Sequence, residues 1–307
     1  MVGLLCPGQG SQYVGMGKDL ADRFPAAREV FERADDALGT ALSRVMWEGP
    51  GDELTATHNA QPAILTHSLA VRAVIVDGLP PVDLGAGHSL GEFSAYVCAG
   101  ALSFEDGVRA VRRRGELMYR AGQERPGTMA AILGLDDAAL EAICREASGQ
   151  DGVCVPANFN GPGQVVISGD GTAVGRAMEL AKEAGARRAM ALNVSGAFHS
   201  PLMAVAEPGL REQLESVDLA VPEFPVVSNV TAAPVSEPAE ARRLLIEQLT
   251  SPVRWTQSMR TMLEAGITRF LELGPGTVLA GLAKRIDRSA SVMGIGTADE
   301  VDTFLGS

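Results

Sequence analysis

Val82 to Gly100 reads VDLGAGHSLGEFSAYVCAG, and this stretch decides the fold class of the chain. Residues 82–86 predict a short buried strand, and residues 89–99 predict a helix with small and apolar side chains. Between them lies Gly87-His88-Ser89-Leu90-Gly91, a G-x-S-x-G motif whose glycines leave room for a sharp strand-to-helix turn. A serine on such a turn exposes its hydroxyl, and the helix N-terminus behind it stabilises a developing oxyanion. We therefore interpret Ser89 as a nucleophile.

Two other interpretations of the same residues are weaker. The first is a plain Gly-Ser turn that joins a strand to a helix without any chemistry. The second is a dinucleotide fingerprint, Gly85-x-Gly87-x-x-Leu90, which fails because Leu90 stands where that pattern needs a small residue.

The composition excludes several classes of protein. A chain of 307 residues with 46% hydrophobic content can bury a substantial core, in one large domain or two unequal ones. Its net charge of −12 argues against nucleic acid or an anionic membrane as the main partner. No apolar run is long enough to span a bilayer, and the N-terminus lacks the pattern of a signal peptide. The four cysteines form no metal-ligand spacing, which predicts reduced core thiols, no metal site and a cytoplasmic location.

Alternating strand and helix patterns along the chain predict an α/β fold. Residues 2–6 form an apolar run that leads into a glycine-rich loop without the lysine of a phosphate-binding loop. Helices are also predicted from Lys18 and over residues 35–45 and 59–76, and a strand over residues 226–230.

The order of predicted elements changes in the middle of the chain, where residues 126–194 predict β-α-β-β-α-β. This is the element order of a ferredoxin-like unit. We predict a large α/β subdomain from residues 1–125 and 195–307, into which residues 126–194 are inserted as a small ferredoxin-like subdomain.

One arginine stands apart on the helix predicted to begin after Ser103. The arginines at 109, 112, 113 and 120 share a solvated face, whereas Arg114 falls on the apolar face with Val111 and Met118. A charge on that face is costly unless a carboxylate pairs with it. Arg114 therefore has either an internal salt bridge or an anionic substrate as its partner.

His199 is one of four histidines and lies in a segment of small and polar residues. A lone histidine commonly makes a structural hydrogen bond, but an exposed nucleophilic serine in the same chain favours a general base. No Asp or Glu stands out as the third member of a catalytic triad, which departs from the usual hydrolase pattern.

Several further segments occur in a fixed order along the chain. They are Pro7-Gly8-Gln9-Gly10-Ser11-Gln12, Gly87-His88-Ser89-Leu90-Gly91, Arg112-Arg113-Arg114-Gly115, Asn158-Phe159-Asn160, Gly196-Ala197-Phe198-His199-Ser200 and Gln248-Leu249-Thr250-Ser251-Pro252-Val253-Arg254-Trp255. In this order and spacing the chain resembles the malonyl-CoA:acyl carrier protein transacylases of fatty acid and polyketide synthesis, over about residues 2–286. The resemblance implies an α/β-hydrolase-like core with an inserted ferredoxin-like subdomain, in agreement with the pattern above.

The resemblance also implies the catalytic roles. Ser89 is the implied nucleophile and His199 its general base, and Gln248 orients the imidazole through its backbone carbonyl. That arrangement accounts for the missing acidic residue. The backbone N–H groups of Gln9 and Leu90 are the implied oxyanion hole.

The same resemblance names the residues that bind substrate. Arg114 is expected to hold the free carboxylate of malonate by a planar two-point contact. Asn160 and Gln61 match family positions near the site. Separately from the resemblance, we predict that Phe198, just before the base, crowds the carbon between the two carbonyls and disfavours an α-methyl branch.

The implied reaction is transfer of malonyl from malonyl-CoA to the phosphopantetheine thiol of an acyl carrier protein through a malonyl-serine intermediate, in a ping-pong scheme without cofactor or metal. The alternatives are a discrete acyltransferase of a polyketide synthase, an acyl-thioester hydrolase on the same fold, and a non-catalytic carrier-binding protein. We expect a monomer. An acidic carrier protein needs a local basic patch on this acidic chain, and the candidates are Lys182, Arg187, Arg188, Lys284, Arg285 and Arg288.

Overall fold

The first strand, β1 (Val2–Cys6), lies inside a six-stranded sheet and is buried along its whole length. The computed structural model describes residues 1–150 and 152–306. The sheet order is β10-β9-β1-β2-β7-β8, with every neighbouring pair parallel except β7 and β8. The other strands are β2 (Leu84–Gly87), β7 (Val226–Val227), β8 (Pro234–Val235), β9 (Arg269–Leu273) and β10 (Ser291–Ile295). A strand buried on both faces reads as a continuous apolar run, as β1 does.

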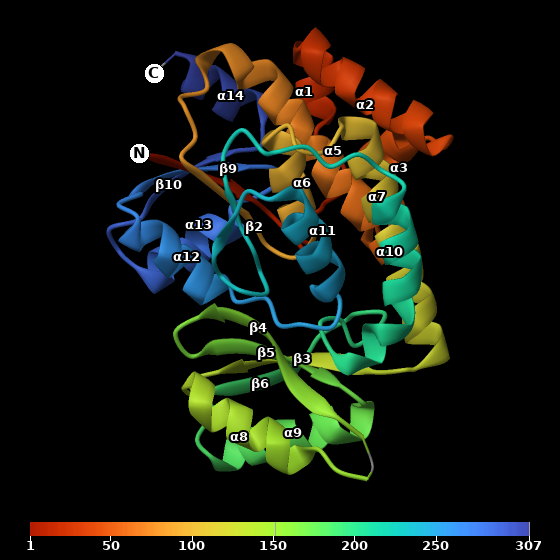
Figure 1. The fold of residues 1–307 in the computed structure, drawn as a ribbon, viewed down its shortest axis with the longest axis vertical. Coiled ribbons are helices and arrows are strands. Elements are labelled where there is room, and N and C mark those ends of the chain that lie inside the picture. Colours follow the sequence, from red (N-terminus) through yellow and green to blue (C-terminus); the bar gives the residue numbers. More distant parts are fainter. Residues whose placement is uncertain (151, 307) are drawn as a thin grey trace.

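Helices cover both faces of this sheet (Figure 1). The long helices α5 (Thr57–Ile75) and α7 (Phe104–Glu124) pack together on one side with α6 (Leu90–Cys98). Gly115 permits this close packing, because a Cβ there would lie 2.6 Å from the Cα of His58. On the other side, α12 (Trp255–Glu264) and α13 (Val278–Ile286) form a separate apolar cluster against the sheet. The remaining helices of this lobe are α1 (Lys18–Arg23), α2 (Pro25–Leu38), α3 (Leu42–Glu48), α4 (Gly51–Thr55), α10 (Glu207–Glu215), α11 (Pro238–Glu247) and α14 (Ala298–Leu305).

A second, four-stranded sheet forms the small lobe. Its antiparallel strands have the order β4-β5-β3-β6, with bounds β3 (Thr128–Leu133), β4 (Cys154–Gly161), β5 (Gln164–Gly169) and β6 (Arg188–Ala191). The helices α8 (Asp137–Ala147) and α9 (Gly171–Glu183) cover one face, and the other face is turned toward the large lobe (Figure 1). The element order is the β-α-β-β-α-β of a ferredoxin-like unit. The predicted α/β class, with a core and a smaller second unit, is confirmed.

Some predicted elements differ from the observed ones. The helix predicted over residues 35–45 is wrong, because α2 ends at Leu38, is capped by Gly39 with φ of 62°, and α3 begins only at Leu42. The strand predicted over residues 226–230 is shorter, since β7 has two residues and the chain then turns toward the site. The cap at Ser103 is confirmed by a hydrogen bond from the Asp106 N–H to its side chain. Among the described residues, no helix combines the length and apolar character needed to cross a bilayer.

Candidate active site

The G-x-S-x-G turn joins β2 to α6 in a conformation that only these glycines allow. A Cβ on Gly87 would lie 1.8 Å from the carbonyl carbon of Gly91, and a Cβ on Gly91 would lie 2.1 Å from the carbonyl oxygen of Cys6. Ser89 itself has φ of 54° and ψ of −109°, a backbone conformation that is strained for a residue with a side chain. The amide oxygen of Asn229 accepts the Ser89 N–H at 2.7 Å and helps to hold this conformation.

Ser89 and His199 meet although they are far apart in the sequence. The Ser89 Oγ lies 2.7 Å from Nε2 of His199, and Nδ1 lies 2.9 Å from the carbonyl oxygen of Gln248 and 3.2 Å from that of Ser251. Carbonyl oxygens only accept, so Nδ1 carries the proton in the neutral ring and Nε2 is free to accept the serine proton. Gln248 thus contacts the imidazole through its backbone. His199 adopts φ of 56°, a second left-handed residue at the site.

Burial keeps His199 neutral. Burial, and after it the nearby guanidinium of Arg114, lower the pKa of His199 to about 3, although the two carbonyl contacts oppose the shift. The imidazole is therefore in its proton-accepting form throughout the neutral range.

Arg114 is 1% exposed and has neutral partners. It donates to the side-chain oxygen of Gln61 at 2.7 Å, to that of Gln248 at 2.8 Å and to Ser89 Oγ at 3.1 Å. Among residues 1–150 and 152–306, no carboxylate forms an ion pair with it within 4.0 Å, so an internal salt bridge is not its explanation. Burial lowers the pKa of Arg114 to about 10, which leaves the side chain charged at neutral pH.

A cavity of about 380 Å³ lies over these side chains, with walls from both lobes. Seven of the predicted site residues line it: Gln9, Ser89, Leu90, Arg114, Asn160, Phe198 and His199. Gln61 and Gln248 are buried behind Arg114 and contact it instead. The side-chain oxygen of Asn160, on β4, accepts a hydrogen bond from Nε2 of His88 at 2.8 Å and so links the small lobe to the nucleophile turn.

The predicted oxyanion donors lie on two neighbouring strand ends. Because β1 and β2 are parallel neighbours, the loop with Gln9 and the turn with Ser89 leave the sheet at the same edge. Leu90 is the first residue of α6, so its N–H has no partner within the helix. A Cβ on Gly8 would lie 2.4 Å from the carbonyl oxygen of His88, which shows how closely the two loops pack.

Sequence analysis missed two buried polar residues beneath this site. Glu92 is fully buried on α6, and Asn229 follows β7. The Asn229 side chain also donates to the carbonyl oxygen of Gly87 at 2.7 Å, so it supports the turn at two points. An acidic residue in an otherwise apolar helix segment, LGEFSAYVC, was the available signal for Glu92. No comparable local signal exists for Asn229. Within the described residues, no three His, Cys, Asp or Glu side chains gather as metal ligands.

Comparison with known proteins shows which family the chain belongs to. The acyl transferase domain family matches residues 4–301. The chain belongs to this family. Among curated acyl transferase relatives, malonyl CoA-acyl carrier protein transacylase of Bacillus subtilis is 47% identical over 99% of this chain and 96% of its own length. The protein of that name from Haemophilus influenzae is 44% identical over 98% of each chain.

Solved acyl transferase structures superpose closely on this chain. The acyl-carrier-protein S-malonyltransferase from Bartonella henselae superposes with a TM-score of 0.95 at 43% identity, over 99% of this chain and 98% of its own. A malonyl-transacylase in complex with a type II polyketide synthase acyl carrier protein superposes with a TM-score of 0.96 at 42% identity, over 99% of both chains. The family resemblance seen in the sequence is thereby confirmed.

Proposed function

We propose that this acyl transferase moves malonyl from malonyl-CoA to the phosphopantetheine thiol of an acyl carrier protein. The observation that supports the proposal is the arrangement of three side chains in one cavity. Ser89 Oγ lies 2.7 Å from the unprotonated Nε2 of His199 and 3.1 Å from the buried guanidinium of Arg114, which has no carboxylate partner among the described residues. The relatives named for malonyl transfer, at 44–47% identity over nearly the whole chain, support the same activity.

In the first half-reaction Ser89 Oγ attacks the thioester carbon and its proton passes to Nε2 of His199. The tetrahedral intermediate collapses, the C–S bond breaks, and the imidazolium returns the proton to the departing coenzyme A thiolate. The N–H groups of Gln9 and Leu90 are the proposed donors to the oxyanion. In the second half-reaction the carrier thiol gives its proton to His199 and attacks the malonyl ester carbon. The C–O bond to Ser89 then breaks, and the imidazolium returns the proton to Ser89 Oγ.

Arg114 is the proposed partner of the malonyl carboxylate. It contacts Ser89 Oγ at 3.1 Å, so a carboxylate close to the ester carbonyl falls within its reach. Burial is the main cause of the low pKa of His199, and pairing with that carboxylate offsets the smaller contribution that the Arg114 charge adds to it. A malonyl group thus makes its own base stronger, which an acetyl group cannot do. Phe198, 6% exposed and lining the cavity, is placed to disfavour an α-methyl branch.

The reaction exchanges one thioester for another, so the free-energy change is small and we propose that no cofactor or metal takes part. We also propose a monomer that works in the cytoplasm. The chain is similar to a malonyl-transacylase bound to a type II polyketide synthase carrier protein, so a discrete acyltransferase of a polyketide synthase is the second candidate. Its chemistry at Ser89 is the same, and the choice between the two depends on the carrier protein that it serves.

Mass spectrometry after brief exposure to malonyl-CoA tests the proposal. We expect a malonyl adduct on Ser89 that persists without acceptor and disappears on addition of holo acyl carrier protein. Rapid loss to water without acceptor supports an acyl-thioester hydrolase instead, and no adduct supports a non-catalytic carrier-binding protein. Loading rates with fatty acid and polyketide carrier proteins separate the two transferase candidates.

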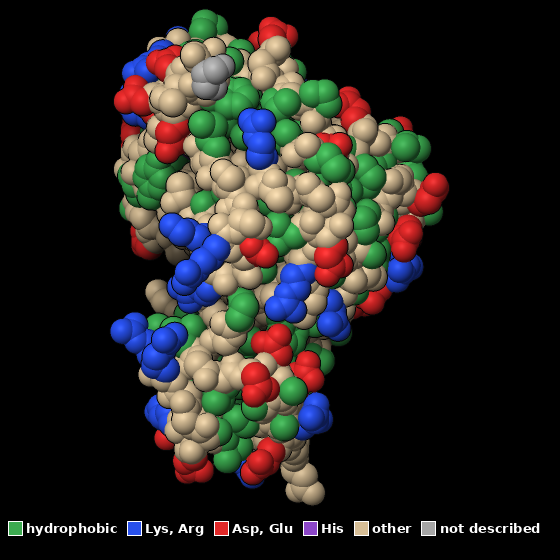
Figure 2. All heavy atoms as spheres, turned by 90° about the vertical axis from the view of Figure 1, so that its left-hand side faces the viewer, with side chains coloured by type: hydrophobic (Ala, Val, Ile, Leu, Met, Phe, Trp, Pro, Cys, Tyr) green, Lys and Arg blue, Asp and Glu red, His purple; other side chains and the backbone are tan. Residues whose placement is uncertain are grey.

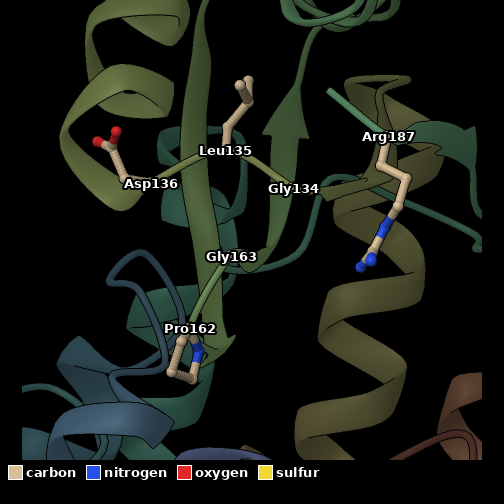
Figure 3. A pocket seen from close by; sticks show the side chains of 6 residues that line it. All are labelled: Gly134, Leu135, Asp136, Pro162, Gly163 and Arg187. Carbon is tan, nitrogen blue, oxygen red and sulfur yellow. The ribbon is translucent and has the colours of Figure 1, made fainter. Parts of the chain in front are cut away.

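The proposed docking surface for the carrier lies where basic side chains gather at the junction of the two lobes (Figure 2). Arg187 lines a hollow of about 450 Å³ beside the β4–β5 turn, on the opposite side from Asp136 (Figure 3). Lys284 and Arg288 line a second hollow of about 530 Å³, and Arg285 donates to Gln164 at 2.6 Å next to the same turn. Lys182 instead pairs with Glu179 at 2.8 Å.

Reversing the charges of Arg187, Lys284 and Arg288 together should raise the KM for the carrier protein severalfold and leave that for malonyl-CoA unchanged. Arg44→Glu, on the exposed surface of α3, is the matched control. Equal effects on both substrates, or an equal effect of the control, would remove these residues from the docking surface.

A further inference from the structure

A carboxylate with no part in the mechanism above lies directly beneath the site. Glu92 is 0% exposed, and its Oε2 accepts hydrogen bonds from Nε2 of Gln248 at 2.7 Å and from the N–H of Asn229 at 3.1 Å. Both donors belong to residues that contact the nucleophile: Asn229 holds the Ser89 N–H, and Gln248 donates to the Ser89 carbonyl at 3.0 Å. Glu92 is thus one residue removed from the reacting groups.

The hydrogen bonds of Gln248 determine which way its side chain faces. Every neighbour of Nε2 is an acceptor, namely Glu92 Oε2, the Ser89 carbonyl and, at 3.5 Å, Oδ1 of Asn229. The amide oxygen must therefore face Arg114, which donates to it at 2.8 Å. The guanidinium and the Glu92 carboxylate are the two ends of one buried chain, joined through a single amide.

We propose that Glu92 is a positioning residue that links malonyl binding to its own protonation: it turns the Gln248 oxygen to Arg114 and supplies a buried negative charge that offsets part of the guanidinium charge until the malonyl carboxylate arrives. This inference rests on the proposed function. When Glu92 is ionised, its charge offsets part of the charge of Arg114 through the shared Gln248 amide. A malonyl carboxylate adds a second negative charge beside one guanidinium, so malonyl binding favours a protonated Glu92.

The groups around Glu92 keep their charge state near neutral pH, where Glu92 itself titrates. Among the described residues that act on Glu92 from other elements, Arg114 on α7 is charged and acts through space, whereas Gln248, Asn229 and Ser228 are neutral and hydrogen-bond to it. On its own helix, the hydroxyl of Tyr96 has a pKa raised well above its usual range by burial, so it stays protonated. Burial raises the pKa of Glu92 to about 7, against the effect of Gln248, Asn229 and Arg114. His199 stays neutral in the same range, because its pKa is lowered to about 3.

The ionisation of Glu92 determines how the KM for malonyl-CoA changes with pH. Above about pH 7 Glu92 is ionised and opposes the malonyl carboxylate, so the KM for malonyl-CoA should rise with pH between 6 and 8.5. Glu92→Gln keeps the shape and removes the charge, so its KM should be independent of pH and about fivefold lower than wild type at pH 8.5. The KM for acetyl-CoA should show no such difference, because acetyl has no carboxylate.

Glu272→Gln is the matched control, since Glu272 is also 0% exposed and accepts two backbone hydrogen bonds away from the cavity. It should keep the wild-type pH profile. Equal pH profiles of wild type and Glu92→Gln, or equal shifts for malonyl-CoA and acetyl-CoA, would overturn the inference.

A measurement on the wild type covers the case in which Glu92→Gln does not fold. Loading with malonyl-CoA in weakly buffered solution at pH 7 should take up a fraction of a proton per site, and loading with acetyl-CoA should take up none. Loading without proton uptake overturns the role of Glu92 alone. Failure of malonyl-CoA to load at all overturns the proposed function as well.

Discussion

Two glycine-rich strand-to-helix turns in the large sheet have similar positions but differ in what their helix N-termini bind. Gly87-His88-Ser89-Leu90-Gly91 joins β2 to α6, and Gly274-Pro275-Gly276 joins β9 to α13. Both turns leave parallel strands that flank β1, and both open a helix. In the second turn a carboxylate already occupies the helix N-terminus, because Glu272 on β9 accepts the N–H groups of Leu279 and Ala280 at 2.9 and 2.8 Å.

At the first turn, none of the described carboxylates accepts the N–H groups that open α6, because Glu92 on the same helix accepts from Asn229 and Gln248 instead. The residue two positions before its first glycine is Gly85, which has no side chain to reach the helix, whereas Glu272 holds the corresponding place before Gly274. A helix N-terminus favours a negative group in either case. The helix N-terminus of α13 is thus satisfied by the chain itself (the closed turn), and we propose that the N-terminus of α6 (the open turn) serves the charge that develops on a substrate.

The largest effect is expected at the open turn. Ser89→Ala should abolish the malonyl adduct, and His199→Ala should slow transfer by roughly four to six orders of magnitude, because a nucleophile and its base act as one unit. Single-turnover kinetics with malonyl-CoA, with circular dichroism to verify folding, measures both. Normal turnover by folded Ser89→Ala protein would show that the open turn is not the reacting site.

The two turns should also differ in their tolerance of a methyl group. Gly91→Ala places a Cβ against the Cys6 carbonyl oxygen and should cost more than about 4 kcal/mol of unfolding free energy, or prevent folding. Gly276→Ala meets no atom within 4 Å and should cost about 1–2 kcal/mol, from its φ of 75° alone. Urea unfolding of both variants measures the difference. Similar losses would mean that packing is not what distinguishes the turns.

Substrate charge is the third point of difference, because the open turn lies beside Arg114. Arg114→Ala should reduce malonyl transfer by about thirtyfold to several thousandfold, the range for loss of a buried charge-assisted contact. Slow acetyl transfer should persist. A competition assay with malonyl-CoA and acetyl-CoA gives the ratio, and an unchanged preference for malonyl would place the carboxylate contact elsewhere.

The smallest effect is expected at the closed turn. Glu272→Gln leaves an amide group against one of the two backbone N–H donors, and should lower the free energy of unfolding by about 1–3 kcal/mol. Transfer by the folded fraction should equal that of wild type. Glu264→Gln at the exposed end of α12 is the control, with an expected change within about 0.5 kcal/mol. A loss of malonyl transfer in Glu272→Gln would mean that the second turn also contributes to the reaction.

Local patterns were sufficient where a short segment carries its own geometry. The bounds of β1 were predicted in full, and the cap at Ser103 was found from residue types alone. Patterns failed where one residue interrupts a helical period, as Gly39 does, and at β7, where the chain turns after two residues. Strand β10 and helix α14 were not predicted at all, although α14 begins with a capping box at Thr297.

The sequence by itself determined the turn around Ser89, the position of Arg114 on an apolar helix face and the ferredoxin-like order of elements, because each depends on residues within one or two segments. Only the tertiary structure decided that Ser89 meets His199 across 110 residues, and that Arg114 finds Gln248 and Gln61 rather than a carboxylate. It also decided that Glu92 lies beneath them. Periodicity reports which face of an element is buried, but the order of strands in the sheet and the paths of the loops determine which buried faces meet.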